Sequence, residues 1–315
     1  MRQTIRSVRS FLFLVAVVFA LPPAKAETFY VDGHGGVPLA VTEVGPETGP
    51  EILFLHGIGM GAASFSEQLD SELAEKFHMV AFDLRGHGMS GKPSTADAYA
   101  NREVWAGDVQ RVIAATGLKR PIIVAWSYGT LVAADYLSLN GPDSISGLVL
   151  ISAFGGLVPP AVRSEPPDEA VMAQLKRYRT MREIPELVAQ QEATDILAPM
   201  LFERTAEGPS KQWIANTKAL GILVPPYAQP HLRAHPNDNA ALVKRLAATP
   251  LQMFHGSKDL GLSAADVAAF KQALPHADIR TFEGAGHSLF AERPVLFNAA
   301  IAAFVEANWR KPDDR

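Results

Sequence analysis

The stretch Val124-Ala125-Trp126-Ser127-Tyr128-Gly129-Thr130 decides the fold, because it joins an apolar run at 121–124 to a helix-like segment through a serine among small residues. A sharp turn from strand to helix needs small residues two positions before and after its centre, since larger side chains would clash with the neighbouring strands. Such a turn raises the Ser127 hydroxyl above the sheet, near a helix N-terminus that stabilises negative charge. This is the layout of a nucleophile elbow. Ala125 replaces the first glycine of G-x-S-x-G, so other residues must support the interpretation.

Strand-like and helix-like segments alternate on both sides of this turn. The sequence predicts eight strands, at 28–32, 39–44, 52–56, 79–83, 122–126, 147–152, 251–255 and 279–283, and helices at 62–76, 102–116, 128–139, 264–273 and 294–309. Alternation of this kind predicts an α/β fold with a doubly wound, mostly parallel eight-stranded sheet and helices on both faces. The short Gly-rich link at 34–36 predicts an antiparallel hairpin at the edge of the sheet.

The alternation stops after the sixth predicted strand. Proline pairs interrupt helix-prone segments there, and no strong strand signal appears before position 250. We therefore predict a core at 27–153 and 250–315, with a helical cap at 154–249 over the carboxyl edge of the sheet. A second independent domain is the alternative. Trp213 and Tyr227 of the cap, with Trp126 of the turn, are candidate substrate-binding residues, although such side chains also serve simply to pack a cap onto a sheet.

The first 26 residues have the order of a secretory signal peptide. Three arginines precede an apolar run at 11–21, and the small-x-small triplet Ala24-Lys25-Ala26 follows. The apolar run would rise only about 16 Å as a helix, against about 30 Å for a bilayer core, so cleavage after Ala26 is favoured over a membrane anchor. The arginines do not form a twin-arginine pair. We expect export by the Sec route to the periplasm or the medium, with no stable membrane anchor after cleavage.

Composition limits the chemistry and the partners. The 315-residue chain has no cysteine, which excludes disulfides, thiol catalysis and thiolate metal sites. After removal of 1–26, 25 basic residues face 33 acidic ones, for a formal charge of about −8. Such a charge disfavours nucleic acid or an anionic membrane as the partner. A small-molecule substrate is expected, and the oligomeric state is left open.

Two residues supply what a serine nucleophile needs. A serine hydroxyl is weakly nucleophilic at neutral pH and requires a base, a carboxylate that orients the base, and donors for the oxyanion. Asp259 follows the predicted strand 251–255 after a short turn, and His287 follows 279–283 on a loop of small residues. Because catalytic groups of parallel sheets gather at the carboxyl ends of the strands, both are expected near Ser127.

Four motifs in this order resemble the α/β-hydrolase superfamily, from about 28 to 309 outside the cap. Besides the turn at Ser127, they are His56-Gly57-Ile58-Gly59, similar to the family's oxyanion loop; Asp83-Leu84-Arg85-Gly86-His87-Gly88-Met89-Ser90, similar to its DxRGxGxS turn; and Gly286-His287 with Glu292-Arg293-Pro294. The order serine, acid, histidine is also that of the family.

This resemblance implies a role for each site residue. Ser127 would be the nucleophile, His287 the general base and then acid, and Asp259 the group that fixes the imidazole tautomer. The backbone N–H groups of Ile58 and Tyr128 would form the oxyanion hole. No cofactor and no metal are implied, because protein groups supply both base and oxyanion donors.

Further histidines have structural interpretations. His56 and His87 are expected to order their Gly-rich turns rather than to react. In the cap, His231 and His235 lie near each other with Arg233, but no acidic residue lies between them. A solvated or pocket-lining face is therefore favoured over a metal site.

We expect an exported serine hydrolase that cleaves a hydrophobic carboxylic ester or lactone through an acyl-enzyme. Hydrolysis of a C–C bond, amide cleavage, acyl transfer and cofactor-free peroxide chemistry use the same triad and stay open, because a fold does not fix the substrate. Serine at 127 argues against dehalogenases and epoxide hydrolases, which use aspartate. A binding protein without turnover is the alternative from another class.

Overall fold

The computed structural model describes residues 26–161, 168–203 and 208–310. Its centre is an eight-stranded sheet with the strand order β1-β2-β4-β3-β5-β6-β7-β8. The strands are β1 Glu27–Asp32, β2 Pro38–Val44, β3 Glu51–Leu55, β4 His78–Phe82, β5 Ile122–Trp126, β6 Gly147–Ile151, β7 Leu251–Gly256 and β8 Asp278–Phe282. All eight predicted strands are confirmed, with ends that differ by one residue at most.

The sheet is mostly parallel, as predicted. Antiparallel pairing is confined to β1 with β2 and β2 with β4, and every pair from β4 to β8 is parallel. The hairpin between β1 and β2 turns at His34–Gly36, where Gly35 and Gly36 have positive φ. The carboxyl ends of β5, β6 and β7 therefore lie side by side at one edge.

Helices cover both faces of the sheet. Strands buried on both sides send alternate side chains to opposite faces. Leu53 and Leu55 of β3 join a core with α3 Arg102–Ala115, α4 Gly129–Asn140 and α9 Ala264–Ala273. Ile52 and Phe54 join a second core with α1 Ser66–Leu69 and α11 Pro294–Asn308.

The predicted helix at 62–76 is wrong as a single element. The chain there forms three short pieces, the 3₁₀ turn Ala62–Phe65, α1 and the 3₁₀ turn Glu72–Glu75. Ser71 ends the helical run because its hydroxyl donates to Gln68 O and accepts from Leu73 N. Ser, Asp and Asn compete with the helix in this way by bonding to nearby backbone groups.

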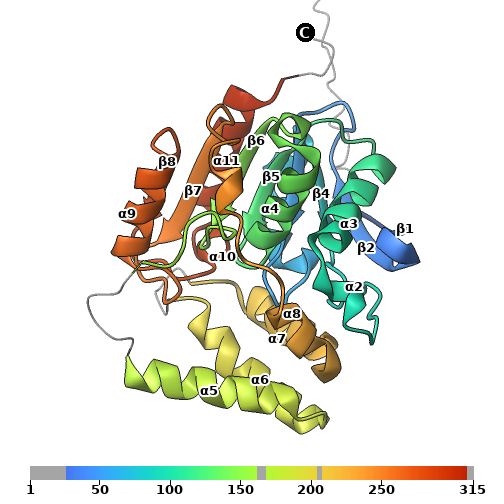
Figure 1. Ribbon diagram of the computed structural model, residues 1–315, viewed down its shortest axis with the longest axis vertical. Helices are drawn as coiled ribbons and strands as arrows, with labels where there is room; N and C mark the ends of the chain where they lie inside the picture. The colour runs from blue at the N-terminus through green and yellow to red at the C-terminus, as the bar shows by residue number, and fades with distance from the viewer. Residues whose placement is uncertain (1–25, 162–167, 204–207, 311–315) are drawn as a thin grey trace, which may run out of the picture.

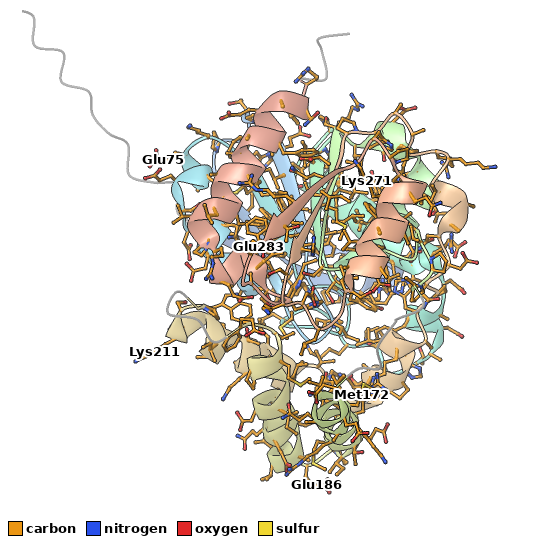
Figure 2. All side chains as sticks on the ribbon, turned by 90° about the vertical axis from the view of Figure 1, so that its left-hand side faces the viewer. Glu75, Met172, Glu186, Lys211, Lys271 and Glu283 are labelled. Atoms are coloured by element: carbon orange, nitrogen blue, oxygen red, sulfur yellow. The ribbon has the colours of Figure 1, made fainter. Side chains whose placement is uncertain are left out.

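The segment between β6 and β7 carries helices, among them α5 Glu169–Glu183, α6 Leu187–Leu197, α7 Lys211–Leu223 and α8 Gln229–Arg233. These four helices lie together below the sheet (Figure 1). Figure 2 shows Met172 within this group and Glu186 at its far end, both below Lys271 and Glu283 on the sheet body. The division into core and cap stays a prediction.

The predicted signal peptide at 1–26 lies outside the described residues except for Ala26. Within the ranges that the structure describes, no helix is long and apolar enough to cross a membrane.

Candidate active site

Ser127 occupies a tight turn between β5 and α4. It adopts a left-handed conformation, with φ +51°, and its backbone N–H donates to Ile151 O at 2.9 Å. A Cβ at Gly129 would lie 2.3 Å from Leu55 O, so only glycine fits there. Ala125 is fully buried in the core, which accommodates its methyl group. The chain therefore forms the predicted turn although the first glycine of the motif is missing.

Asp259 and His287 meet across the ends of β7 and β8. The Nδ1 atom of His287 lies 2.9 Å from Oδ1 and 3.1 Å from Oδ2 of Asp259. The Asp259 side chain is completely buried, and its Oδ1 also accepts the Gly261 N–H at 2.7 Å. A buried carboxylate that accepts from Nδ1 fixes the imidazole so that Nε2 is free to act as a base.

The two groups shift each other's protonation. Burial opposes ionisation of Asp259, but the charge of His287 and the hydrogen bonds to the carboxylate outweigh it and hold the pKa of Asp259 below its usual value. Burial also disfavours the imidazolium, but the charge and the hydrogen bond of Asp259, with Glu292 nearby, raise the pKa of His287 above 6.5. The pair therefore favours a carboxylate beside an imidazole that readily accepts a proton.

Polar contacts hold the loop that carries His287. Its carbonyl oxygen accepts the Trp126 indole N–H at 2.9 Å, and the Gly286 N–H donates to the buried carboxylate of Glu292 at 3.0 Å. Trp126 is 1% exposed. It does not line the pocket described below. Its ring packs beneath the His287 loop, and substrate binding by Trp126 stays a prediction.

Two backbone N–H groups beside Ser127 are available to an oxyanion. In the described part of the chain, those of Ile58 and Tyr128 have no acceptor. Both residues line the pocket that contains Ser127. Unpaired N–H groups in a pocket are donors ready for developing negative charge. Within the same ranges no hydrogen bond joins Ser127 Oγ to His287, and such catalytic contacts often tighten only when substrate binds.

A pocket of about 660 Å³ opens on Ser127. Its wall is mainly apolar and comes from the start of α4, the loop after β6, the segment before β7 and the loop after β7. Lining residues include Leu131, Phe154, Val158, Asn237, Asp238, Ala240 and Leu262. None of the lining residues lies in α5, α6, α7 or α8.

The two cap residues predicted to bind substrate lie elsewhere. Trp213 is 1% exposed and donates its indole N–H to Ser64 O at 2.9 Å, which anchors α7 to the loop after β3. Tyr227 is 47% exposed, and its hydroxyl donates to Lys92 O. Both aromatic side chains attach the insertion to the sheet domain, and substrate binding by Trp213 or Tyr227 stays a prediction.

Comparison with known proteins agrees with this geometry. A family model described as alpha/beta hydrolase fold matches residues 50–294. The chain belongs to the alpha/beta hydrolase fold family.

Several relatives match this alpha/beta hydrolase over most of its length. The AB hydrolase superfamily protein YisY of Bacillus subtilis is 26% identical over 284 residues, which are 87% of this chain and 98% of the relative. The non-heme chloroperoxidase of Streptomyces lividans is 26% identical over 272 residues, 84% and 94% of the two chains. A solved Burkholderia cenocepacia structure, assigned as an aryl esterase, has a TM-score of 0.76 and 25% identity, covering 89% of this chain and 98% of its own.

The histidines of the other motifs, His56 and His87, are structural in this hydrolase. His56 is fully buried; its Nε2 accepts the Leu84 N–H at 2.9 Å, which leaves Nδ1 to donate to Gly57 O at 2.8 Å. Burial lowers the pKa of His56 to about 4 and that of His87 to about 3. Both rings are therefore neutral at pH 7 and hold the turns beside the oxyanion donors.

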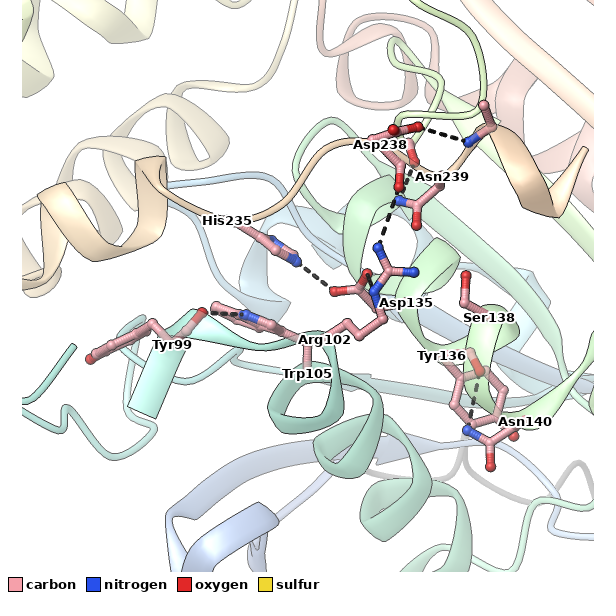
Figure 3. A network of polar contacts seen from close by, with 12 residues as sticks. Tyr99, Arg102, Trp105, Asp135, Tyr136, Ser138, Asn140, His235, Asp238 and Asn239 are labelled. Atoms are coloured by element: carbon pink, nitrogen blue, oxygen red, sulfur yellow. Dashed lines mark hydrogen bonds and ion pairs between the residues drawn. The ribbon is translucent and has the colours of Figure 1, made fainter. Parts of the chain in front are cut away.

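The end of the insertion is tied to α4 by a buried network (Figure 3). His235 Nε2 lies 2.5 Å from Asp135 Oδ2, and Arg102 reaches both Asp135, at 3.9 Å, and Asp238 O, at 3.3 Å. The prediction of a solvated or pocket-lining face is wrong for His235, which is 6% exposed and hydrogen-bonded to Asp135. This network fixes the segment from which Asp238 and Ala240 line the pocket.

Sequence reasoning missed the apolar wall of the pocket. Leu131 lies four residues after Ser127 and thus one helical turn along α4, a spacing that could have identified it. Phe154 and Leu262 follow strand ends next to the site, which is the only other signal they carry. In the described residues, no group of three or more His, Cys, Asp or Glu side chains is placed to hold a metal ion.

Proposed function

We propose that this alpha/beta hydrolase is a serine esterase that hydrolyses carboxylic esters, lactones included, through an acyl-enzyme. The observation that carries the proposal is the Asp259–His287 pair beside a pocket that contains Ser127 and two unpaired N–H groups. The likeness to the assigned aryl esterase of Burkholderia cenocepacia supports it.

Each residue has one role in the reaction. Ser127 Oγ attacks the ester carbonyl while His287 Nε2 takes its proton, and the resulting oxyanion accepts from the N–H groups of Ile58 and Tyr128. His287 then returns the proton to the leaving alcohol, which departs and leaves an acyl-serine. A water molecule, deprotonated by His287, attacks this ester and releases the acid. Asp259 keeps its negative charge throughout and orients the imidazole.

The pocket supports a hydrophobic acyl or aryl group. The wall near Ser127 contains Leu131, Phe154, Val158 and Leu262, whereas Asp238 and Asp266 lie among the lining residues as acidic groups. An anionic substrate would meet carboxylates there, so neutral esters fit better.

Substitution of Ser127 by alanine tests the reaction. Loss of a triad serine reduces kcat by about 10⁶-fold in well-studied cases. We expect a loss of this order on a short-chain p-nitrophenyl ester, and labelling of the wild-type enzyme by a fluorophosphonate at Ser127. Ser64→Ala, at a buried serine away from the pocket, is the matched control. Full activity of folded Ser127→Ala would refute the proposal, and a folded wild-type protein without an adduct would favour a binding protein.

A second candidate is peroxide chemistry at the same serine, favoured by the likeness to the Streptomyces lividans chloroperoxidase. Hydrogen peroxide would replace water in attack on the acyl-enzyme, giving a peracid and free Ser127. Bromination of a phenol that depends on both acetate and peroxide, and disappears in Ser127→Ala, would establish it.

We also propose export, from the sequence of residues 1–26. Expression of the full chain in a bacterium and N-terminal sequencing of the protein outside the cytoplasm should give Glu27 as the first residue. An intact N-terminus in the cytoplasmic fraction alone would contradict export.

A further inference from the structure

Ser152 lies directly between the turn of Ser127 and the strand that leads to Asp259. The Ser127 N–H donates to Ile151 O, and the N–H of the next residue, Ser152, donates to Phe254 O at 3.0 Å. This places Ser152 one residue beyond β6, between the end of β5, which leads to Ser127, and the end of β7, which leads to Asp259. It also lines the pocket with Ser127.

The backbone of Ser152 is unusual in the same way as that of Ser127. These two are the non-glycine residues with positive φ in the described ranges, +51° at Ser127 and +57° at Ser152. Such conformations are costly for residues with a Cβ and persist where the surroundings impose them, often at functional sites. The conformation turns the Ser152 side chain out of the regular strand pattern.

The Ser152 hydroxyl is a buried donor without a satisfactory acceptor. The residue is 2% exposed, and its Oγ has no hydrogen-bond partner among the described residues. A buried hydroxyl normally finds a partner, because leaving it unpaired costs free energy. The rotation of a hydroxyl hydrogen is not fixed by the heavy atoms, so a nearby acceptor can take it.

The carboxylate of Asp259 has room to accept a further hydrogen bond, as the Ser152 hydroxyl requires. Its Oδ1 accepts from Gly261 N at 2.7 Å and from His287 at 2.9 Å, whereas Oδ2 has only the longer 3.1 Å contact with the same imidazole nitrogen. The carboxylate is completely buried, so bulk water does not reach its free lone pairs. The titratable groups around it are His287 and, on β7, His255.

We propose that Ser152 is a positioning residue whose hydroxyl donates to Asp259 and so fixes the carboxylate that orients His287. This inference rests on the proposed serine hydrolase function for its effect on turnover. With Oδ2 held by Ser152, rotation of the carboxylate away from the imidazole would break a second hydrogen bond.

The protonation of Asp259 supports the same contact. Burial raises the pKa of Asp259, but the charge of His287 and nearby donor groups, to which the Ser152 hydroxyl adds the smallest contribution, hold it below its usual value. Loss of a donor to an ionised carboxylate raises the pKa of the acid.

The test compares Ser152→Ala and Ser152→Gly with the wild type and with Ser64→Ala. Ser64 is a matched control, because its hydroxyl is also buried and unpaired but lies outside the pocket. The first readout is the pKa of Asp259 from a titration of side-chain carboxyl groups by ¹³C NMR, which needs no turnover. We expect both Ser152 variants to bind a proton at Asp259 about tenfold more tightly than the wild type, and Ser64→Ala to match the wild type.

Kinetics supply the second readout. We expect kcat to fall about tenfold in both Ser152 variants with KM little changed, since the lost contact acts on the base and not on the substrate. Glycine suits a positive φ, so a purely structural role predicts that Ser152→Gly is benign and Ser152→Ala is not.

An unchanged pKa of Asp259 in Ser152→Ala and Ser152→Gly would overturn the inference. The NMR result is independent of the proposed function, whose own failure would appear as a wild-type protein that neither hydrolyses esters nor reacts with a fluorophosphonate.

Discussion

The carboxyl edge of the sheet and the helices α5–α8 differ in what they contribute to the site. At the edge, short loops leave β5, β7 and β8; they bring Asp259 and His287 into contact and place Ser127 at the end of β5 in the pocket. The helices, although they lie on the same side, contribute no lining residue to the pocket. Among the described residues, the insertion reaches the pocket only through its two ends, the loop after β6 and the segment around Asp238. Position beside a strand end, not membership of the insertion, therefore decides which side chains face Ser127.

Substitution of Asp259 by asparagine should have the largest effect at the edge. The amide can donate to Nδ1 of His287 and thereby favours the wrong imidazole tautomer, and the equivalent change in a serine protease lowers kcat about 10⁴-fold. We expect a similar loss, measured on a p-nitrophenyl ester, with little change in the melting temperature. A decrease of less than about tenfold would mean that the carboxylate is not the orienting group.

Trp213→Ala tests the helices. In contrast to the Asp259 substitution, it should lower the stability of the fold and leave the choice of substrate unchanged. The indole is fully buried and bonded to Ser64 O, so its truncation should lower the free energy of unfolding by about 3–5 kcal/mol. Denaturant melts measure this loss. Among correctly folded molecules, counted by fluorophosphonate labelling, the preference between short and long acyl esters should stay unchanged. An altered preference would show that α7 takes part in selectivity.

Sequence information was sufficient at the edge because the signals there are local. The small residues around Ser127, the turn before Asp259 and the Gly-rich loop before His287 each fix a strand end, and parallel strands bring these ends together. Trp213 and Tyr227 could not be placed in this way. An aromatic residue in a helical insertion buries its ring equally well against the sheet domain or around a substrate, and only the tertiary packing distinguishes the two.

Local sequence signals were also insufficient for two other features, the segment 62–76 and the contact between His235 and Asp135. The segment 62–76 was expected to be one helix but is interrupted at Ser71, whose hydroxyl bonds to its own backbone neighbours. The second joins residues 100 positions apart, a contact that no local pattern encodes.

The pH dependence of kcat/KM should report the Asp259–His287 pair. Because the pKa of His287 is raised above 6.5, the imidazole is mostly protonated below that raised pKa and cannot act as a base. Below this pKa, kcat/KM should fall about tenfold per pH unit. Measurement between pH 4 and pH 9 on one neutral ester decides it. A limb at or below 6.5 would mean that Asp259 does not support the imidazolium in the free enzyme.

The free energy of unfolding should contain contributions from histidines that change with pH in opposite directions. The raised pKa of His287 contributes stability that is present below about pH 6.5 and is lost as pH rises through the higher folded value. His56 and His87, with pKa values lowered to about 4 and about 3, contribute in the other direction, and their contribution is lost as pH falls below about 6.5. Mild acid should therefore weaken the turns beside the oxyanion donors.

Phe154→Ala is the counterpart of Trp213→Ala at an end of the insertion. Phe154 lines the pocket and stacks on Phe270 at a ring distance of 4.9 Å, so its truncation should enlarge the acyl site. We expect the ratio of kcat/KM for long over short acyl esters to rise by up to about tenfold, the scale on which apolar pockets discriminate. A ratio does not depend on the fraction of active enzyme, so a loss of stability would not disguise the result. An unchanged ratio would mean that the ends of the insertion contribute no more to acyl selectivity than the helices α5–α8 do.

Tyr227→Phe should have the smallest effect. The Tyr227 ring is half exposed, and its hydroxyl contacts the Lys92 carbonyl oxygen at the surface. Water replaces such an exposed hydrogen bond, so the free energy of unfolding should change by no more than about 0.5 kcal/mol. Kinetic constants on short and long esters should equal those of the wild type, because Tyr227 does not line the pocket. If KM for a bulky ester rose while stability stayed constant, this face of the insertion would have to approach the substrate during turnover, and the contrast with the strand ends would then hold only for the free enzyme.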